Sequence, residues 1–276
     1  MKRVIRTIPS LAMAAGLASV PVTAFANHSW SNYHWARSQN PVSLVITDNV
    51  SPVWDPYLDD AFADWSQSTV LALIKAAGNG QAKPCKATDG QINVCSAAYG
   101  YTNWLGIAQV WLSGDHITKA VTKLNDSYFS TTTYNHSYWR ALVTCQEVGH
   151  AFGLTHQDEN FDNSNLGTCM DYTSNPLGPP DNQHPNSHDL EELSIIYGSH
   201  LDSGGGSVGG GGPPPGKGRN KARVENDLGN LRSGWGRVIG YTADGRPDVY
   251  MTNLGDGRRV ITHVFWVPDA ERGHQH

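Results

Sequence analysis

The chain has 276 residues, of which 39% are hydrophobic, 9% aromatic and 16% charged, and its formal net charge is -5. This length can bury one sizeable core, and so low a charged fraction, together with nine Trp and eleven Tyr, argues against an intrinsically disordered protein. The acidic balance also argues against nucleic-acid binding, because neutralising phosphate groups needs a basic surface.

The first 26 residues have the pattern of an export signal. Basic residues precede an apolar stretch at 11–22, and Ala24-Phe25-Ala26 provides a small-x-small cleavage site. The alternative, a membrane anchor, needs about 20 unbroken apolar residues, and Pro and Gly interrupt this stretch. We therefore expect a secreted, extracellular protein that is cleaved after Ala26 and has no membrane span.

The remaining chain divides at a run rich in glycine and proline, residues 203–217. Residues 27–216 hold 7 basic and 18 acidic side chains, whereas residues 217–276 hold 10 basic and 7 acidic ones. We predict one domain over 27–202, a linker over 203–217, and a small basic β module over 218–276. The opposite charge of this module suggests that it docks on the acidic domain.

Hydrophobic periodicity predicts the elements of the first domain in chain order. They are a strand at 42–47, a helix at 56–66, a strand at 70–74, an exposed loop at 78–90, strands at 105–112 and 116–123, a helix from about 137 to 152, and a last helix from 187 to 198. Beyond the linker, three short strands are expected at 237–241, 248–252 and 260–267, separated by glycine-containing turns.

Four cysteines in an exported chain predict two disulfides, with three possible pairings. A short clip between Cys85 and Cys95 is the favoured first pair. A reduced four-cysteine zinc site is the rival interpretation, and the lack of paired C-x-x-C spacing argues against it.

The stretch from Gln146 to His156 has the spacing of a metal site. Gln146 and His150 are four residues apart, so on a helix they share one face and can grip one ion. Glu147 is rotated one residue around the helix, which suits a carboxylate that polarises a metal-bound water without being a ligand. Gly153 allows a sharp turn, after which His156 can return as a third ligand.

This stretch resembles the extended zinc motif of the metzincin metallopeptidases, H-E-x-x-H-x-x-G-x-x-H, with Gln146 in place of the first histidine. The second hallmark of that family, a methionine turn beneath the metal, is matched by Cys169-Met170-Asp171-Tyr172. The resemblance covers most of residues 42–198, and the final stretch is similar to the last helix of matrixin-like domains.

The resemblance implies an α+β fold with a twisted mixed sheet, a metal-binding helix, a methionine turn and a C-terminal helix. It implies one Zn²⁺ held by Gln146, His150 and His156, with Glu147 as general base and Met170 beneath the metal. Tyr172 would approach the metal or stabilise the transition state. A Cys145–Cys169 bridge would tie the metal helix to the methionine turn.

The expected function is therefore that of a secreted zinc-dependent endopeptidase, which would bind an extended peptide along an edge strand at 105–112. A weakened or differently metallated enzyme and a catalytically inactive extracellular binding or scaffold protein remain open, because a glutamine oxygen is a weaker zinc ligand than imidazole. A purely structural helix with incidental histidines is a further alternative. Oligomeric state is not predicted.

Other polar side chains are expected to be solvated. The acidic loop Asp158, Glu159 and Asp162 offers oxygen ligands for Ca²⁺, but its spacing matches no calcium loop. The remaining candidate histidines, His116, His136, His184 and His188, are each expected at the surface rather than in place of the missing ligand.

Overall fold

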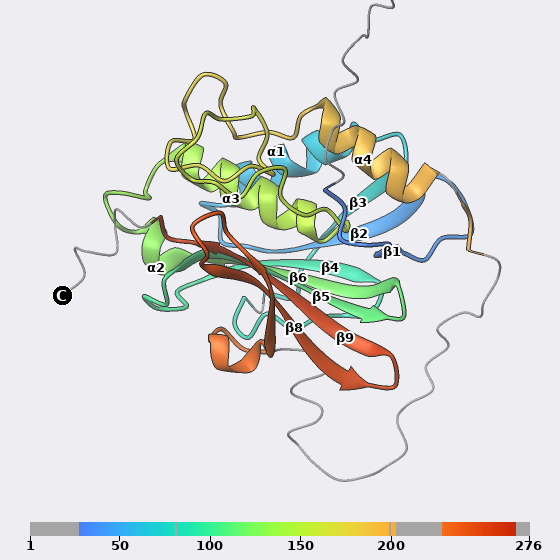
Figure 1. The fold of residues 1–276 in the computed structure, drawn as a ribbon. Coiled ribbons are helices and arrows are strands. Elements are labelled where there is room, and N and C mark those ends of the chain that lie inside the picture. The colour runs from blue at the N-terminus through green and yellow to red at the C-terminus, as the bar shows by residue number, and fades with distance from the viewer. Residues whose placement is uncertain (1–27, 81, 199, 203–227, 269–276) are drawn as a thin grey trace, which may run out of the picture.

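The computed structural model describes residues 28–80, 82–198, 200–202 and 228–268, which form a mixed nine-stranded sheet with the three longest helices on one face (Figure 1). The expected export signal at 1–26 and the linker at 203–217 lie outside these residues. Helices segregated to one face of a mixed sheet define an α+β fold, as predicted.

One part of the sheet is parallel, in the order β3-β2-β4-β6. Its strands are β2 (Val42–Asn49), β3 (Leu71–Ala77), β4 (Gln91–Ala97) and β6 (His116–Asn125), and the short β1 (His34–Trp35) pairs in parallel with the start of β6. β5 (Trp104–Ser113) runs antiparallel beside β6. Strands β1 and β4 and the short helix α2 (Asp126–Phe129) have no counterpart in the predicted elements.

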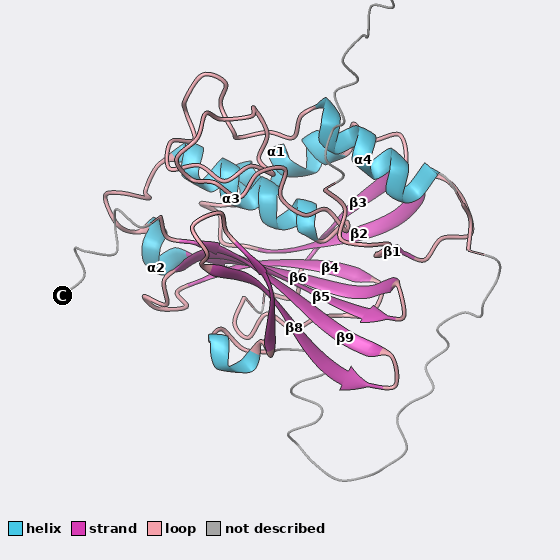
Figure 2. Cartoon of the chain, in the orientation of Figure 1, coloured by secondary structure: helices cyan, strands magenta, loops and turns pink. Residues whose placement is uncertain are grey.

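Three longer helices cover one face of the sheet (Figure 2). They are α1 (Asp55–Trp65), α3 (Ser137–His150) and α4 (Ser187–Gly198), close to the predicted bounds. α3 packs on α1, β5 and β6, and the Trp65 indole N–H donates to the Cys145 carbonyl at 3.1 Å. The apolar core therefore fixes α3 directly above the middle of the sheet.

The C-terminal strands belong to this same sheet. β7 (Arg237–Tyr241), β8 (Pro247–Gly255) and β9 (Arg258–Trp266) form the predicted meander, and β9 pairs antiparallel with β5 from Trp104 to Ser113. The expectation that residues 105–112 form a free edge strand for substrate is therefore wrong. Every residue from Val260 to Trp266 is buried, which is typical of a strand covered on both faces.

Docking of the meander creates a second core on the face of the sheet away from α3. Trp104, Trp235, Tyr250 and Trp266 are buried there, and the Arg246 guanidinium lies 4.2 Å from the Trp266 ring centroid. The module does dock on the first domain, as its charge suggested, but the buried contacts are mainly apolar rather than ionic.

Both disulfides pair as favoured from the sequence, Cys85 with Cys95 and Cys145 with Cys169. The second bridge links α3 to the turn that carries Met170. Within the described residues, no helix has the length and apolar character needed to cross a membrane.

Candidate metal centre

Two imidazoles converge where α3 ends. His150 is the last residue of α3, and Gly153 follows with a φ of 100°. This conformation favours glycine, and a Cβ at this position would lie 2.4 Å from the Tyr33 carbonyl oxygen. The resulting turn returns the chain so that the Nε2 atoms of His150 and His156 lie 3.1 Å apart.

The ring of His150 has a defined tautomer. Its Nδ1 lies 2.9 Å from the Leu154 carbonyl oxygen, which can only accept a proton, so Nδ1 carries the hydrogen and Nε2 carries a lone pair. Burial and the neighbouring His156 lower the pKa of His150 well below its ordinary value, and burial lowers that of His156 to about 3. The two imidazoles are therefore neutral. Their separation is close to the distance of about 3.3 Å between two nitrogen ligands of one tetrahedral zinc ion.

Glu147 lies on the same helix and is fully buried. Neither carboxylate oxygen has a hydrogen-bond partner of good geometry among the described residues, and burial raises the pKa of this carboxyl well above its usual range, against a small opposing effect of the Phe265 backbone N–H. Gly106 in β5 leaves room for it, since a Cβ there would lie 2.7 Å from Oε1. A buried carboxylate without partners is costly and points to a function outside the packing of the core.

Gln146 occupies the predicted position one helical turn before His150. Its amide N–H donates to the Cys169 carbonyl at 2.7 Å, which leaves Oε1 buried and without a hydrogen-bond partner in the described chain. The methionine turn thus holds the amide so that a neutral oxygen, the weaker of the expected ligand types, remains available.

The methionine turn lies under α3 as expected. A Cβ on Gly149 would be 2.5 Å from the Met170 sulfur, so this methionine contacts the helix directly. The Tyr172 ring lies 4.1 Å from that of His156, but its hydroxyl donates to Asp248 Oδ2 at 3.1 Å and lies 3.2 Å from the Val264 carbonyl oxygen. The meander therefore engages the hydroxyl that was expected to approach the metal or stabilise the transition state.

Two further side chains of the site come from the meander and were not predicted. His263 in β9 stacks on His150 with ring centroids 4.1 Å apart. Asp248 in β8 places Oδ2 3.8 Å from His156 Nδ1, and burial together with Glu159 raises the pKa of Asp248 to about 7. No local spacing in the sequence connects these residues to the motif.

The donor set fits a zinc ion. It combines the paired imidazoles of His150 and His156 with the buried amide oxygen of Gln146 one helical turn earlier. The carboxylates of Asp248 and Glu159 lie on the Nδ1 side of His156, at 3.8 and 3.9 Å, too far to hydrogen-bond the ring. On that other side of the ring, the donors of His156, Glu159 and Asp248 lie within 4.8 Å of one another, away from the Nε2 atom that meets His150. Access is narrow, because the cavity beside His150 and His263 has about 10 Å³, room for about one water molecule.

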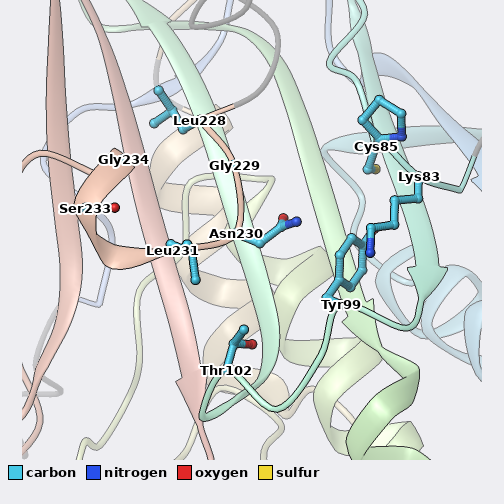
Figure 3. Close-up of a pocket in the computed structure, with 11 residues that line it drawn as sticks. Lys83, Cys85, Tyr99, Thr102, Leu228, Gly229, Asn230, Leu231, Ser233 and Gly234 are labelled. Carbon is cyan, nitrogen blue, oxygen red and sulfur yellow. The ribbon is translucent and has the colours of Figure 1, made fainter.

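A roomier cavity lies elsewhere. A hollow lined by residues that include Lys83, Tyr99 and Asn230 (Figure 3) lies beside the second core and away from α3, and its volume is about 620 Å³. It contains none of the predicted site residues.

The other candidate ligands behave differently from one another. Asp158 accepts hydrogen bonds from Asn160 and Asn163 within its own loop, while Glu159 faces His156. His184 pairs with Asp64 at the surface, as a solvated histidine can. His116, expected to be a simple surface residue, instead joins a cluster described below.

Substituting Gly149 by alanine tests the fit of the methionine turn. A Cβ there would also lie 2.8 Å from Trp65 Cζ2, and the buried Trp65 cannot retreat. Helix propensity favours alanine by about 1 kcal/mol, whereas overpacking costs about 1–3 kcal/mol. We expect urea denaturation to show a net loss of stability of up to about 2 kcal/mol.

Gly198→Ala is the matched control for this substitution. It also lies in a helix, and a Cβ there meets nothing within 4 Å. Gly198→Ala should leave stability unchanged or slightly raised, and equal effects of the two substitutions would contradict the tight contact at Met170.

Comparison with known proteins does not assign this chain to a family. No protein-family model matches this chain, and no curated protein does. The chain is similar to myroilysin at 13% identity and a TM-score of 0.35, over 60% of this chain and 83% of that one. It is also similar to high choriolytic enzyme 1, a hatching enzyme zinc-protease from Oryzias latipes (medaka fish), at 13% identity and a TM-score of 0.33, over 62% of this chain and 98% of that one. Scores this low assign no family, so the function depends on the residues of the site.

Proposed function

We propose that this protein is a secreted zinc-dependent endopeptidase of the metzincin type, with zinc held by His150, His156 and the amide oxygen of Gln146. The observation that carries the proposal is the 3.1 Å approach of two neutral imidazoles beside a buried carboxylate whose oxygens make no hydrogen bond of good geometry in the described chain. Structural packing alone gives no reason to keep that carboxylate.

When bound, zinc would polarise the scissile carbonyl and lower the pKa of water. Glu147 would take the proton of the attacking water and pass it to the leaving amine, a role that suits a carboxyl whose pKa burial has raised well above its usual range. Tyr172 could stabilise the developing oxyanion once its hydroxyl leaves Asp248 and the Val264 carbonyl.

A catalytically inactive extracellular binding or scaffold protein is the second candidate, and one observation favours it. β9 occupies the edge of β5 along which an extended peptide would pair, and the site beneath is almost fully buried. The endopeptidase proposal therefore requires that β9 move when substrate binds.

Metal content measured together with casein or gelatin cleavage separates the two candidates. We expect the full chain without its export signal to cleave protein in a zinc-dependent manner, and His150→Ala to lose both cleavage and one zinc equivalent. Bound zinc without cleavage would favour the scaffold protein, and loss of neither property in His150→Ala would contradict this metal centre.

A further inference from the structure

A second group of ligand-type side chains lies away from α3, where β1 meets β6. We call it the His34 cluster; it consists of His34, His116, His200 and Asp202. β1 and β6 pair in parallel with His34 opposite His116, and the other two members follow α4. Three segments far apart in the sequence thus place their side chains at one point.

The donor atoms of the cluster converge. Asp202 Oδ1 lies 3.1 Å from the Nε2 of His116, 3.4 Å from that of His34 and 3.6 Å from that of His200. The Nε2 atoms of His34 and His200 lie 3.2 Å apart. Four ligands at about 2.0–2.1 Å from a tetrahedral zinc are about 3.3–3.4 Å from each other, which is the middle of this observed range.

Hydrogen bonding among neutral imidazoles and the carboxylate explains only part of this geometry. The Nδ1 of His34 lies 2.6 Å from the Asn32 carbonyl oxygen and must donate to it, so the neutral ring has a lone pair on Nε2. That lone pair faces a carboxylate oxygen and a second imidazole nitrogen. A neutral His200 ring can donate its Nε2–H to that lone pair, but the contact with the carboxylate oxygen is repulsive unless His34 is protonated or a cation lies between the donors.

The surrounding backbone holds the cluster in place. Arg37 N–H donates to Asp202 Oδ2 at 2.8 Å, and Asp202 N–H donates to the Arg37 carbonyl at 2.9 Å. The guanidinium of Arg37 also donates to the His200 carbonyl. His34 is nearly buried, while the side chains of His116 and His200 are 43% and 45% exposed, so an ion can enter from solvent.

We propose that the His34 cluster binds one structural zinc ion that joins the segment before β2 to the segment after α4. Three imidazoles and one carboxylate favour zinc over magnesium or calcium, which take oxygen ligands in larger numbers. This site is separate from the His150–His156 pair and does not depend on peptidase activity.

Zinc titration of the metal-free full chain tests the proposal at pH 7. We expect His116→Ala to bind one zinc equivalent fewer than the wild type, whether or not the α3 site also fills. Zinc should raise the thermal midpoint of the wild type by several degrees, and this gain should be smaller in the variant. Magnesium should give neither effect.

His200→Ala repeats the test from a different segment, so the proposal does not depend on the folding of one variant. The matched control is His184→Ala, because His184 also pairs with an aspartate, Asp64 at 2.7 Å, but has no converging imidazoles in the described residues. It should bind as much zinc as the wild type. Equal zinc stoichiometry in all four proteins would overturn the site and leave protonated histidines as the explanation.

Discussion

A chain that ends at Asp202 is expected not to fold cooperatively. Removing the meander strips β9 from β5 and exposes five apolar side chains that remain from the second core, Tyr99, Trp104, Ile107, Trp111 and Val121. Burying such side chains contributes about 1.5–3 kcal/mol each, on the order of 10 kcal/mol together, which is comparable to the whole stability of a domain. Circular dichroism on heating should show no cooperative transition.

A chain that ends at Pro268 is the control, because it keeps every strand of the described sheet. Its thermal transition should match that of the full chain. If the chain ending at Asp202 unfolds cooperatively near the wild-type midpoint, then residues 27–202 fold independently, as composition and the glycine-rich run first suggested, and the meander is an accessory.

Local sequence patterns predicted the strands of the meander but not their position in the sheet. Alternation and glycine turns mark each strand, whereas the β5–β9 pairing joins residues about 150 positions apart that no local spacing relates. Burial on both faces of β9 was nevertheless readable in its nearly continuous apolar run, Val260 to Trp266 with Thr262 and His263 inside it. Such a run indicates a central strand and argues against an exposed module.

The sequence did not predict β4, because buried polar residues interrupt its apolar pattern. Five consecutive residues of this strand are buried, yet Asn93 and Ser96 are among them. Asn93 donates to the Thr88 hydroxyl, and the Ser96 hydroxyl accepts from Ser51 N–H. Because polar side chains that find partners can be buried at little cost, hydrophobic periodicity understates such a strand.

The candidate site shows the same division between local and distant information. The spacing of His150, Gly153 and His156 is local and predicted the convergence that the structure shows. His263 and Asp248 reach the site only through the sheet, and the His34 cluster assembles from β1, β6 and the segment after α4. Residues that are distant in the sequence and meet only in the folded chain produce no periodic pattern from which their contact could be predicted.

Glu147→Gln is expected to lower the rate of peptide hydrolysis by about 10²–10⁴, because the amide cannot accept the proton of the attacking water. The same substitution should stabilise the metal-free protein. The folded-state pKa of Glu147 is raised above its unfolded value, so ionisation costs stability as pH rises beyond that unfolded value. The thermal midpoint of the variant should therefore exceed the wild-type value at pH 8, and the gap should close near pH 4.

Glu192→Gln separates these effects from the loss of any buried carboxylate. Glu192 in α4 is also buried, and its oxygens likewise have no hydrogen-bond partner in the described part of the chain, but it lies outside the α3 motif. This variant should keep the wild-type rate of casein cleavage. An unchanged rate of cleavage in Glu147→Gln would exclude Glu147 as the base. A reduced rate, together with a thermal midpoint that increasingly exceeds the wild-type midpoint as pH rises, would show that the wild-type protein loses stability at this position in exchange for catalysis.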